Sequence, residues 1–206
     1  MAVPGENQMS ARPQEITRKI ETMSSVPSLR RLILTGFMGA GKSTVGRLLA
    51  SRLGWEFLDL DTHLENRTGA TIPQLFAYGE PHFRRLESTA LASALGKSHI
   101  VLALGGGTPE GLTNRLLIEQ TPDTLGVFLD APFPTLFDRC MLQEIDRPVL
   151  ADPTEAQLRF DRRRPLYVRI SQVIVDTSQL TPEDTVEAIL TRLNQISQLR
   201  FKASKS

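Results

Sequence analysis

A glycine-rich segment between an apolar run and a helical pattern constrains the fold of this chain more than any other feature. Residues 36–43 read Gly-Phe-Met-Gly-Ala-Gly-Lys-Ser and match the pattern G-x-x-x-x-G-K-[ST]. The apolar run Leu32–Thr35 precedes it, and Lys42–Leu53 follow it with one apolar stripe of helical period. A strand, a tight loop and a helix in this order predict a sheet with helices packed against it.

The same segment predicts a phosphate-binding loop, or P-loop. Its glycines allow successive backbone N–H groups to point at phosphate oxygens, and the helix that follows adds partial positive charge at its N-terminus. Lys42 would add a full charge near the β- and γ-phosphates, and the Ser43 hydroxyl would ligate magnesium. The alternative is a chance match in a glycine-containing turn. The flanking strand and helix favour nucleotide binding.

Beyond this loop, short apolar runs alternate with longer segments of helical period, which predicts an α/β fold with a parallel sheet. Four more strands are expected, at Glu56–Leu60, Ile100–Leu104, Gly126–Leu129 and Val173–Val175. Further helices are expected at Thr62–Asn66, Ile72–Phe76, Glu80–Leu95, Thr113–Glu119, Pro134–Leu142, Thr154–Arg169 and Pro182–Leu199.

The length of 206 residues predicts one domain, at residues 29–206. Residues 1–28 are rich in polar residues and proline, and we expect a flexible tail. Alternatively, Met23 is the true start of the protein. The acidic residues of this segment argue against an organellar targeting peptide.

Charge and cysteine content exclude several classes of protein. The 24 Lys and Arg residues balance 23 Asp and Glu residues, so no global field would attract nucleic acid or an acidic membrane. The single Cys140 forms no internal disulfide, and the three histidines lack the spacing of a zinc site. No run approaches the roughly 20 apolar residues that span a bilayer. We expect a soluble protein of a reducing cytoplasm.

Two carboxylates follow the second predicted strand. Asp59 and Asp61 are two residues apart at its end, so their side chains are expected to point the same way, toward the crevice where α/β proteins bind ligands. One carboxylate would hold magnesium through water, and the other would orient an acceptor hydroxyl. The simpler reading of Asp61 is a helix N-cap for Thr62 onward.

Arginines and a triple glycine suggest an anionic acceptor. Arg84 and Glu87 share a helix face, so the acid would brace a guanidinium that recognises a carboxylate; an exposed surface pair is the alternative. Gly105-Gly106-Gly107 directly follow a strand and predict a wall that faces a ligand.

Further arginines lie later in the chain. Arg147 occupies a polar stretch suited to a lid over the phosphates, where it would stabilise the transferring phosphoryl group. Three more arginines precede Pro165, which prevents a regular helical hydrogen bond, and one of them would reach the pocket.

In order and spacing, these motifs resemble the shikimate kinase family. The resemblance covers about residues 32–193 and rests on the P-loop, Leu58-Asp-Leu-Asp61, Phe83-Arg-Arg-Leu-Glu87, Gly105-Gly-Gly107, Arg147-Pro and Arg163-Arg-Pro-Leu-Tyr167. It implies a three-layer P-loop kinase fold with a five-stranded sheet, a helical substrate-binding region near residues 62–95 and a lid near residues 141–155.

The resemblance also implies roles for individual residues and ATP with Mg²⁺ as cofactors. Asp61 would bind the shikimate hydroxyls, Arg84 and Arg163 its carboxylate, and the Gly105–Gly107 backbone its ring oxygens. Catalysis would depend on Lys42, Asp61 and Arg147, and Ser43 with water-linked Asp59 would hold the metal. The residues implied for ATP are Gly39, Ala40, Gly41, Lys42, Ser43, Thr44, Arg139 and Arg147. The protein would act on one small molecule, as a monomer, without nucleic acid or membrane partners.

The chain departs from the family pattern at three places, one of which is the N-terminal tail, since the compact enzymes have no counterpart of it. Thr108-Pro109-Glu110 follow the glycines where a small residue and Val are usual, so the family pattern does not predict the shape of the pocket there. The segment from Arg147 to Arg163 is a few residues shorter than in many members, so Arg162 and Arg164 are alternatives to Arg163. A kinase for another hydroxy acid such as gluconate, or a catalytically silent nucleotide-binding relative, are the competing hypotheses.

Overall fold

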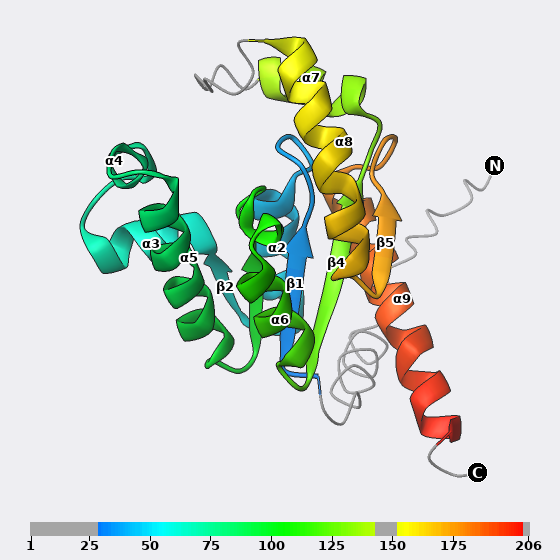
Figure 1. Cartoon of the computed structure of the whole chain (residues 1–206). Coiled ribbons are helices and arrows are strands. Elements are labelled where there is room, and N and C mark those ends of the chain that lie inside the picture. Colours follow the sequence, from blue (N-terminus) through cyan, green and yellow to red (C-terminus); the bar gives the residue numbers. More distant parts are fainter. Residues whose placement is uncertain (1–28, 143–151, 204–206) are drawn as a thin grey trace, which may run out of the picture.

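A computed structural model describes residues 29–142 and 152–203, which form a parallel sheet covered by helices on both faces (Figure 1). The sheet has the order β2-β3-β1-β4-β5, and all four pairings are parallel. Its strands are β1 (Arg31–Thr35), β2 (Glu56–Asp59), β3 (Ile100–Ala103), β4 (Thr124–Asp130) and β5 (Val173–Asp176). The predicted α/β class and five-stranded parallel sheet are therefore confirmed, with strand ends that differ from the predictions by one or two residues.

The helices also follow the predicted pattern. They are α2 (Lys42–Leu53), α3 (Leu60–Thr68), α4 (Ile72–Ala77), α5 (Glu80–Leu95), α6 (Leu112–Gln120), α7 (Phe133–Met141), α8 (Pro153–Arg169) and α9 (Pro182–Ala203), with one 3₁₀ turn, η1 (Thr108–Glu110). None of these described helices combines the length and the apolar character needed to cross a bilayer. The predicted tail at residues 1–28 and most of the predicted lid lie outside the described residues.

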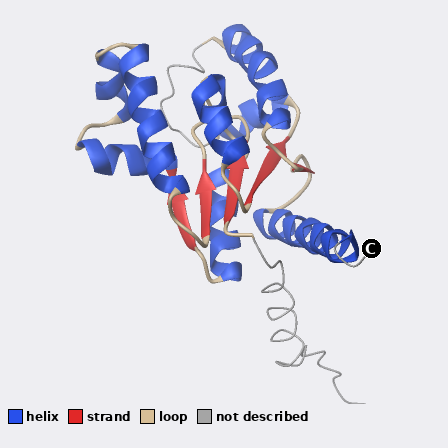
Figure 2. Ribbon diagram, turned by 60° about the horizontal axis from the view of Figure 1, so that its bottom comes forward, coloured by secondary structure: helices blue, strands red, loops and turns tan. Residues whose placement is uncertain are grey.

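The alternation of side chains along β1, the central strand, explains why helices pack on both faces of the sheet. Leu32 and Leu34 of β1 pack with α2 and α9 in one apolar cluster, whereas Ile33 between them packs with α5 and α6 in a second cluster. Successive side chains of a strand point to opposite faces, so one buried strand contributes to both cores. Figure 2 shows the sheet between helices in this way.

The chain order creates a topological switch point at the edge of the sheet formed by the carboxyl ends of the strands. From β1 the chain crosses to β2 on one side, and later it passes from β3 across β1 to β4. Ligands of open α/β sheets bind outside the carboxyl ends of the strands at such a point. Figure 1 shows α3 and α4 on one side of this edge and α8 on the other.

Helix α8 contacts the sheet closely at Gly126 of β4. A Cβ atom built on Gly126 would overlap the carbonyl oxygen of Ile170 at the end of α8 and lie 3.0 Å from the Ser171 Cα. The Gly126 N–H also donates to Gln172 Oε1 at 2.7 Å. This close approach anchors the helix that carries Arg163.

We predict that Gly126→Ala destabilises the protein by about 1–3 kcal/mol, because the new methyl group must displace backbone rather than a mobile side chain. Urea unfolding followed by circular dichroism measures the change. Gly96→Ala is the matched control, since Gly96 has a helical φ of −69° and the atom nearest to a Cβ there would be the Ser93 carbonyl oxygen, at 3.3 Å. Equal effects of the two substitutions would contradict this account of the contact.

Candidate functional site

The P-loop adopts the backbone that its sequence predicts. Gly39 and Gly41 have φ angles of +78° and +84°, which side-chain-bearing residues rarely adopt, and Gly41 is the N-cap of α2. The Lys42 ammonium donates to the carbonyl oxygens of Gly36 at 2.9 Å and Phe37 at 3.1 Å. These bonds hold the lysine against the loop whose amides are expected to bind phosphate.

A cavity of about 460 Å³ joins this loop to Asp61, Gly105, Gly106 and Arg163 of the residues predicted for the acceptor, whereas Arg84 and Gly107 are not part of its lining. Its lining comprises Met38, Gly39, Gly41, Lys42, Ser43, Thr44, Asp59, Asp61, Leu104, Gly105, Gly106 and Arg163. The volume lies in the range of small-molecule sites. Two predicted groups, one for phosphates and one for an anionic acceptor, therefore face a single space.

Asp59 is positioned both as a helix cap and as a partner of the P-loop. Its Oδ1 accepts the N–H groups of Asp61 at 3.1 Å and Thr62 at 3.4 Å, while its Oδ2 accepts from Ser43 Oγ at 2.7 Å. Asp59, and not Asp61, is therefore the N-cap of α3. The paired hydroxyl and carboxylate oxygens fit a hydrated Mg²⁺, which prefers oxygen ligands and keeps several waters.

The predicted position of Asp59 and Asp61 together at the end of one strand is wrong. Strand β2 ends at Asp59 and α3 begins at Leu60, so the two acids do not alternate along one strand. Both nevertheless line the cavity, because Asp61 lies in the first turn of a helix capped by Asp59.

Burial, together with the nearby carboxylates Asp59 and Glu87, raises the pKa of Asp61 to about 6. Gly105 makes room for this carboxylate: a Cβ there would lie 2.7 Å from Asp61 Oδ1. A carboxyl group with a pKa near neutrality, beside a phosphate loop, is suited to accept a proton from a hydroxyl.

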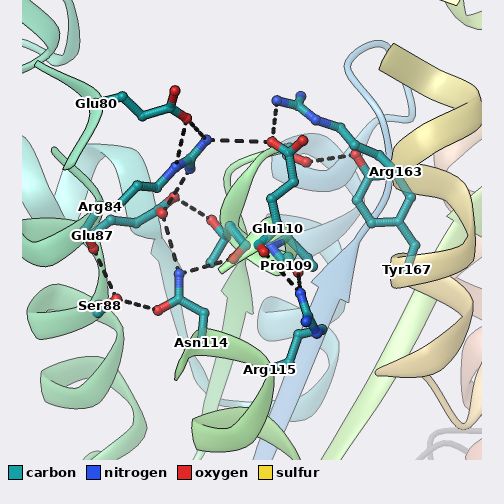
Figure 3. Close-up of polar contacts among 12 residues, drawn as sticks. Glu80, Arg84, Glu87, Ser88, Pro109, Glu110, Asn114, Arg115, Arg163 and Tyr167 are labelled. Carbon is teal, nitrogen blue, oxygen red and sulfur yellow. Dashed lines mark hydrogen bonds and ion pairs between the residues drawn. The ribbon is translucent and has the colours of Figure 1, made fainter. Parts of the chain in front are cut away.

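Arg84 is braced as predicted, by a carboxylate that is only 2% exposed. Its Nη1 donates to Glu87 Oε2 at 3.0 Å. The same Glu87 accepts from Thr108 Oγ1 at 2.8 Å and from Asn114 Nδ2 at 3.3 Å. Glu80, which is 66% exposed, also contacts Arg84, at 3.2 Å. Arg84 is therefore held by a buried network and is not an isolated surface pair (Figure 3).

Of the three consecutive arginines, Arg163 lines the cavity, as the resemblance implies. Helix α8 continues through Pro165, and one turn after Arg163 the Tyr167 hydroxyl donates to the Gly106 carbonyl at 2.7 Å. Arg164 pairs with Asp130 at 2.6 Å instead. The helix thus presents Arg163 and Tyr167 to the triple glycine.

Glu110 lies among three arginines, an arrangement that the sequence did not reveal. Its carboxylate accepts from Arg163 Nη2 at 2.7 Å and Arg162 Nη2 at 2.8 Å, and Arg84 Nη2 lies at 3.4 Å. Burial opposes ionisation of Glu110, but its bonds and ion pairs with Arg163 and Arg162 outweigh burial and lower its pKa. The only sequence signal was the unusual Thr108-Pro109-Glu110 after the glycines.

Arg139, which was predicted to lie beside the nucleotide, stands apart from this group. Arg139 of α7 donates to the carbonyl oxygens of Thr177 at 2.6 Å and Ser178 at 3.3 Å. It does not line the described cavity. Arg147, predicted for the lid, lies outside the described residues.

Comparison with known proteins identifies relatives over most of the chain. A family model for shikimate kinase matches residues 38–194. A shikimate kinase from Pseudomonas entomophila is 42% identical over 173 residues, which span 82% of this chain and 98% of that protein. The structure of a shikimate kinase from Acinetobacter baumannii in complex with shikimate has a TM-score of 0.75 at 34% identity, and the match covers 83% of this chain and 96% of that chain.

A gluconokinase from Sinorhizobium meliloti also has this fold. Its structure has a TM-score of 0.57 at 18% identity, over 84% of this chain and 97% of that chain. At this identity the likeness concerns the fold alone and does not favour gluconate as the acceptor.

We predict that Asp61→Asn stabilises the protein by about 1–3 kcal/mol at pH 8, because ionising this carboxyl costs more in the folded state than in the unfolded state. Between about pH 4 and 6 the folded wild type binds the extra proton, so wild-type stability falls as the pH rises through this window.

Urea unfolding of both proteins at pH 8 and pH 4 measures the effect. The gain from Asp61→Asn should be present at pH 8 and absent near pH 4. Asp161→Asn, at an exposed position, is the control and should change stability by less than about 0.5 kcal/mol at either pH. A gain that is the same at both pH values would contradict the assigned pKa.

Proposed function

The chain belongs to the shikimate kinase family, and from that premise we propose how its own residues transfer the γ-phosphoryl group of ATP to the 3-hydroxyl of shikimate. The products are shikimate 3-phosphate and ADP, in the pathway to chorismate and the aromatic amino acids. The observation that carries this proposal is the single cavity, lined by the P-loop on one side and by Asp61, Gly106 and Arg163 on the other.

At the phosphate side, the P-loop amides and Lys42 would hold the β- and γ-phosphates. Because carbonyl oxygens of the loop already hold the Lys42 ammonium, little reorganisation would be needed when the nucleotide binds. Ser43 directly, and Asp59 through a water, would hold Mg²⁺, whose charge stabilises the phosphates when it is bound. Arg139 would lie beside adenine, and Arg147 would cover the transferring group.

At the acceptor side, Asp61 would hydrogen-bond the acceptor hydroxyl and take its proton as the phosphoryl group transfers. The pKa of about 6 leaves this carboxyl ionised at neutral pH and still basic enough to act. Arg84 and Arg163 would bind the shikimate carboxylate, and backbone groups of Gly105–Gly107 would contact the ring oxygens. Positioning and charge stabilisation, rather than a covalent intermediate, would supply the rate.

The oligomeric state, the partners and the cellular location of the enzyme are predicted from the sequence. We propose a monomer that acts on a small molecule, without nucleic acid or membrane partners, in the cytoplasm. The balanced charge and the single, buried Cys140 support this proposal.

A coupled ADP-release assay with MgATP tests the function. We expect ADP formation with shikimate, and only the no-acceptor background with gluconate. Lys42→Ala should lower kcat by about 10²–10³-fold, as expected when a donor to the transition-state charge is removed. Lys97→Ala, at a lysine that pairs with Glu56 outside the cavity, is the matched control and should retain activity. ADP release at background level with shikimate would refute the proposal.

A further inference from the structure

The Glu110 carboxylate lies where the proposed function places the carboxylate of the substrate. It bonds to Arg163 at 2.7 Å and lies 3.4 Å from Arg84, the two arginines proposed for shikimate. Figure 3 shows the Glu110 side chain between the Arg84 and Arg163 side chains. A planar guanidinium binds a glutamate carboxylate and a substrate carboxylate with the same donors, so the two groups require the same positions.

The backbone that carries Glu110 is held firmly, which leaves its side chain as the part that can move. Arg115 Nη1 donates to the carbonyl oxygens of Pro109 at 2.6 Å and Glu110 at 2.9 Å. The Thr108 carbonyl accepts from Asn114 Nδ2 at 2.9 Å. The Glu110 side chain itself is 21% exposed, so rotation toward solvent can free the arginines without moving the turn.

The charges near the two arginines also favour replacement of the Glu110 carboxylate by the substrate carboxylate over binding of both at once. Arg84 is already paired with the buried Glu87 and the exposed Glu80, and Glu110 adds a third carboxylate beside it. A substrate carboxylate added next to Glu110 would meet like charge at short range, which is unfavourable in a partly buried site.

Arg163, in contrast, has capacity for another partner. Within the described residues its Nε is buried and has no hydrogen-bond partner, and the residue lines the cavity. Because Arg163 lines the cavity, a ligand carboxylate that enters it can contact this guanidinium and take the position that Glu110 occupies.

We propose that Glu110 lowers the affinity of the site for acidic substrates, as an internal carboxylate that occupies Arg84 and Arg163 in the free enzyme and is displaced by the carboxylate of the substrate. This inference rests on the proposed function. Displacement costs binding free energy for every acidic substrate, so only an acid that also gains contacts elsewhere in the cavity binds well. The displacement therefore raises KM and leaves kcat unchanged, because Glu110 has already moved before phosphoryl transfer begins.

Steady-state kinetics of Glu110→Gln with shikimate and saturating MgATP tests the proposal. We expect KM for shikimate to fall by about 5- to 30-fold, the range that corresponds to losing the competing charge-assisted hydrogen bonds, with kcat within about 2-fold of wild type. Glu110→Ala, which removes the carboxylate altogether, should lower KM in the same direction if it folds with a comparable melting temperature.

Glu80→Gln is the matched control. It removes another carboxylate from Arg84, but from an exposed side chain that does not contact Arg163. Exposed pairs of this kind contribute little, so KM should stay within about 2-fold of wild type.

Shikimate methyl ester, which lacks the negative charge, separates competition between charges from simple widening of the pocket. Its KM should differ by less than about 2-fold between wild type and Glu110→Gln. A fall in KM for the ester as large as the fall for shikimate would overturn the proposal in favour of a steric effect.

The outcomes separate this inference from the proposed function. No shikimate-dependent turnover by the wild type would refute the function, and the inference with it. Turnover by the wild type with an unchanged KM in Glu110→Gln would refute the inference alone. A raised KM would also refute it, because Glu110 would then be holding the arginines in place for the substrate.

Discussion

The buried carboxylate of Glu87 is the constraint on which the acceptor side of this structure depends. A carboxylate that is 2% exposed is stable only with several partners, and here they come from three separate elements: Arg84 of α5, Thr108 of η1 and Asn114 of α6. Removal of any one partner would leave the buried Glu87 carboxylate with too few hydrogen bonds to compensate for its burial. One side chain therefore fixes both the arginine and the turn that follows the triple glycine.

The turn fixed in this way has two consequences for the site. It holds Gly107 where a Cβ would lie 2.9 Å from Arg84 Nη2 and 3.1 Å from Arg163 Nη2, so a larger residue there would require the guanidinium groups to shift. It also directs Glu110 toward the same guanidinium groups. The geometry that assembles a carboxylate-binding site thus also places an internal carboxylate in it. The affinity of the site for an acidic substrate therefore depends on how well the substrate carboxylate competes with Glu110.

Local signals in the sequence were sufficient for the fold, but contacts between distant residues were not predictable. Lys42–Leu53 was predicted with the observed bounds because a glycine at each end, Gly41 and Gly54, marks the helix termini. The arrangement of Asp59 and Asp61 was predicted wrongly, since the strand gives way to a helix cap between them. Glu110 meets Arg163 across 53 residues, and no periodicity or motif predicts which arginine an isolated acid will contact.

A crystal structure of the enzyme with ADP, Mg²⁺ and shikimate tests the central claim most directly. We expect the 3-hydroxyl of shikimate at hydrogen-bond distance from Asp61 and the shikimate carboxylate on Arg84 and Arg163, with the Glu110 side chain turned away from both arginines. Shikimate bound with its carboxylate away from both arginines, while Glu110 still contacts them, would contradict the account.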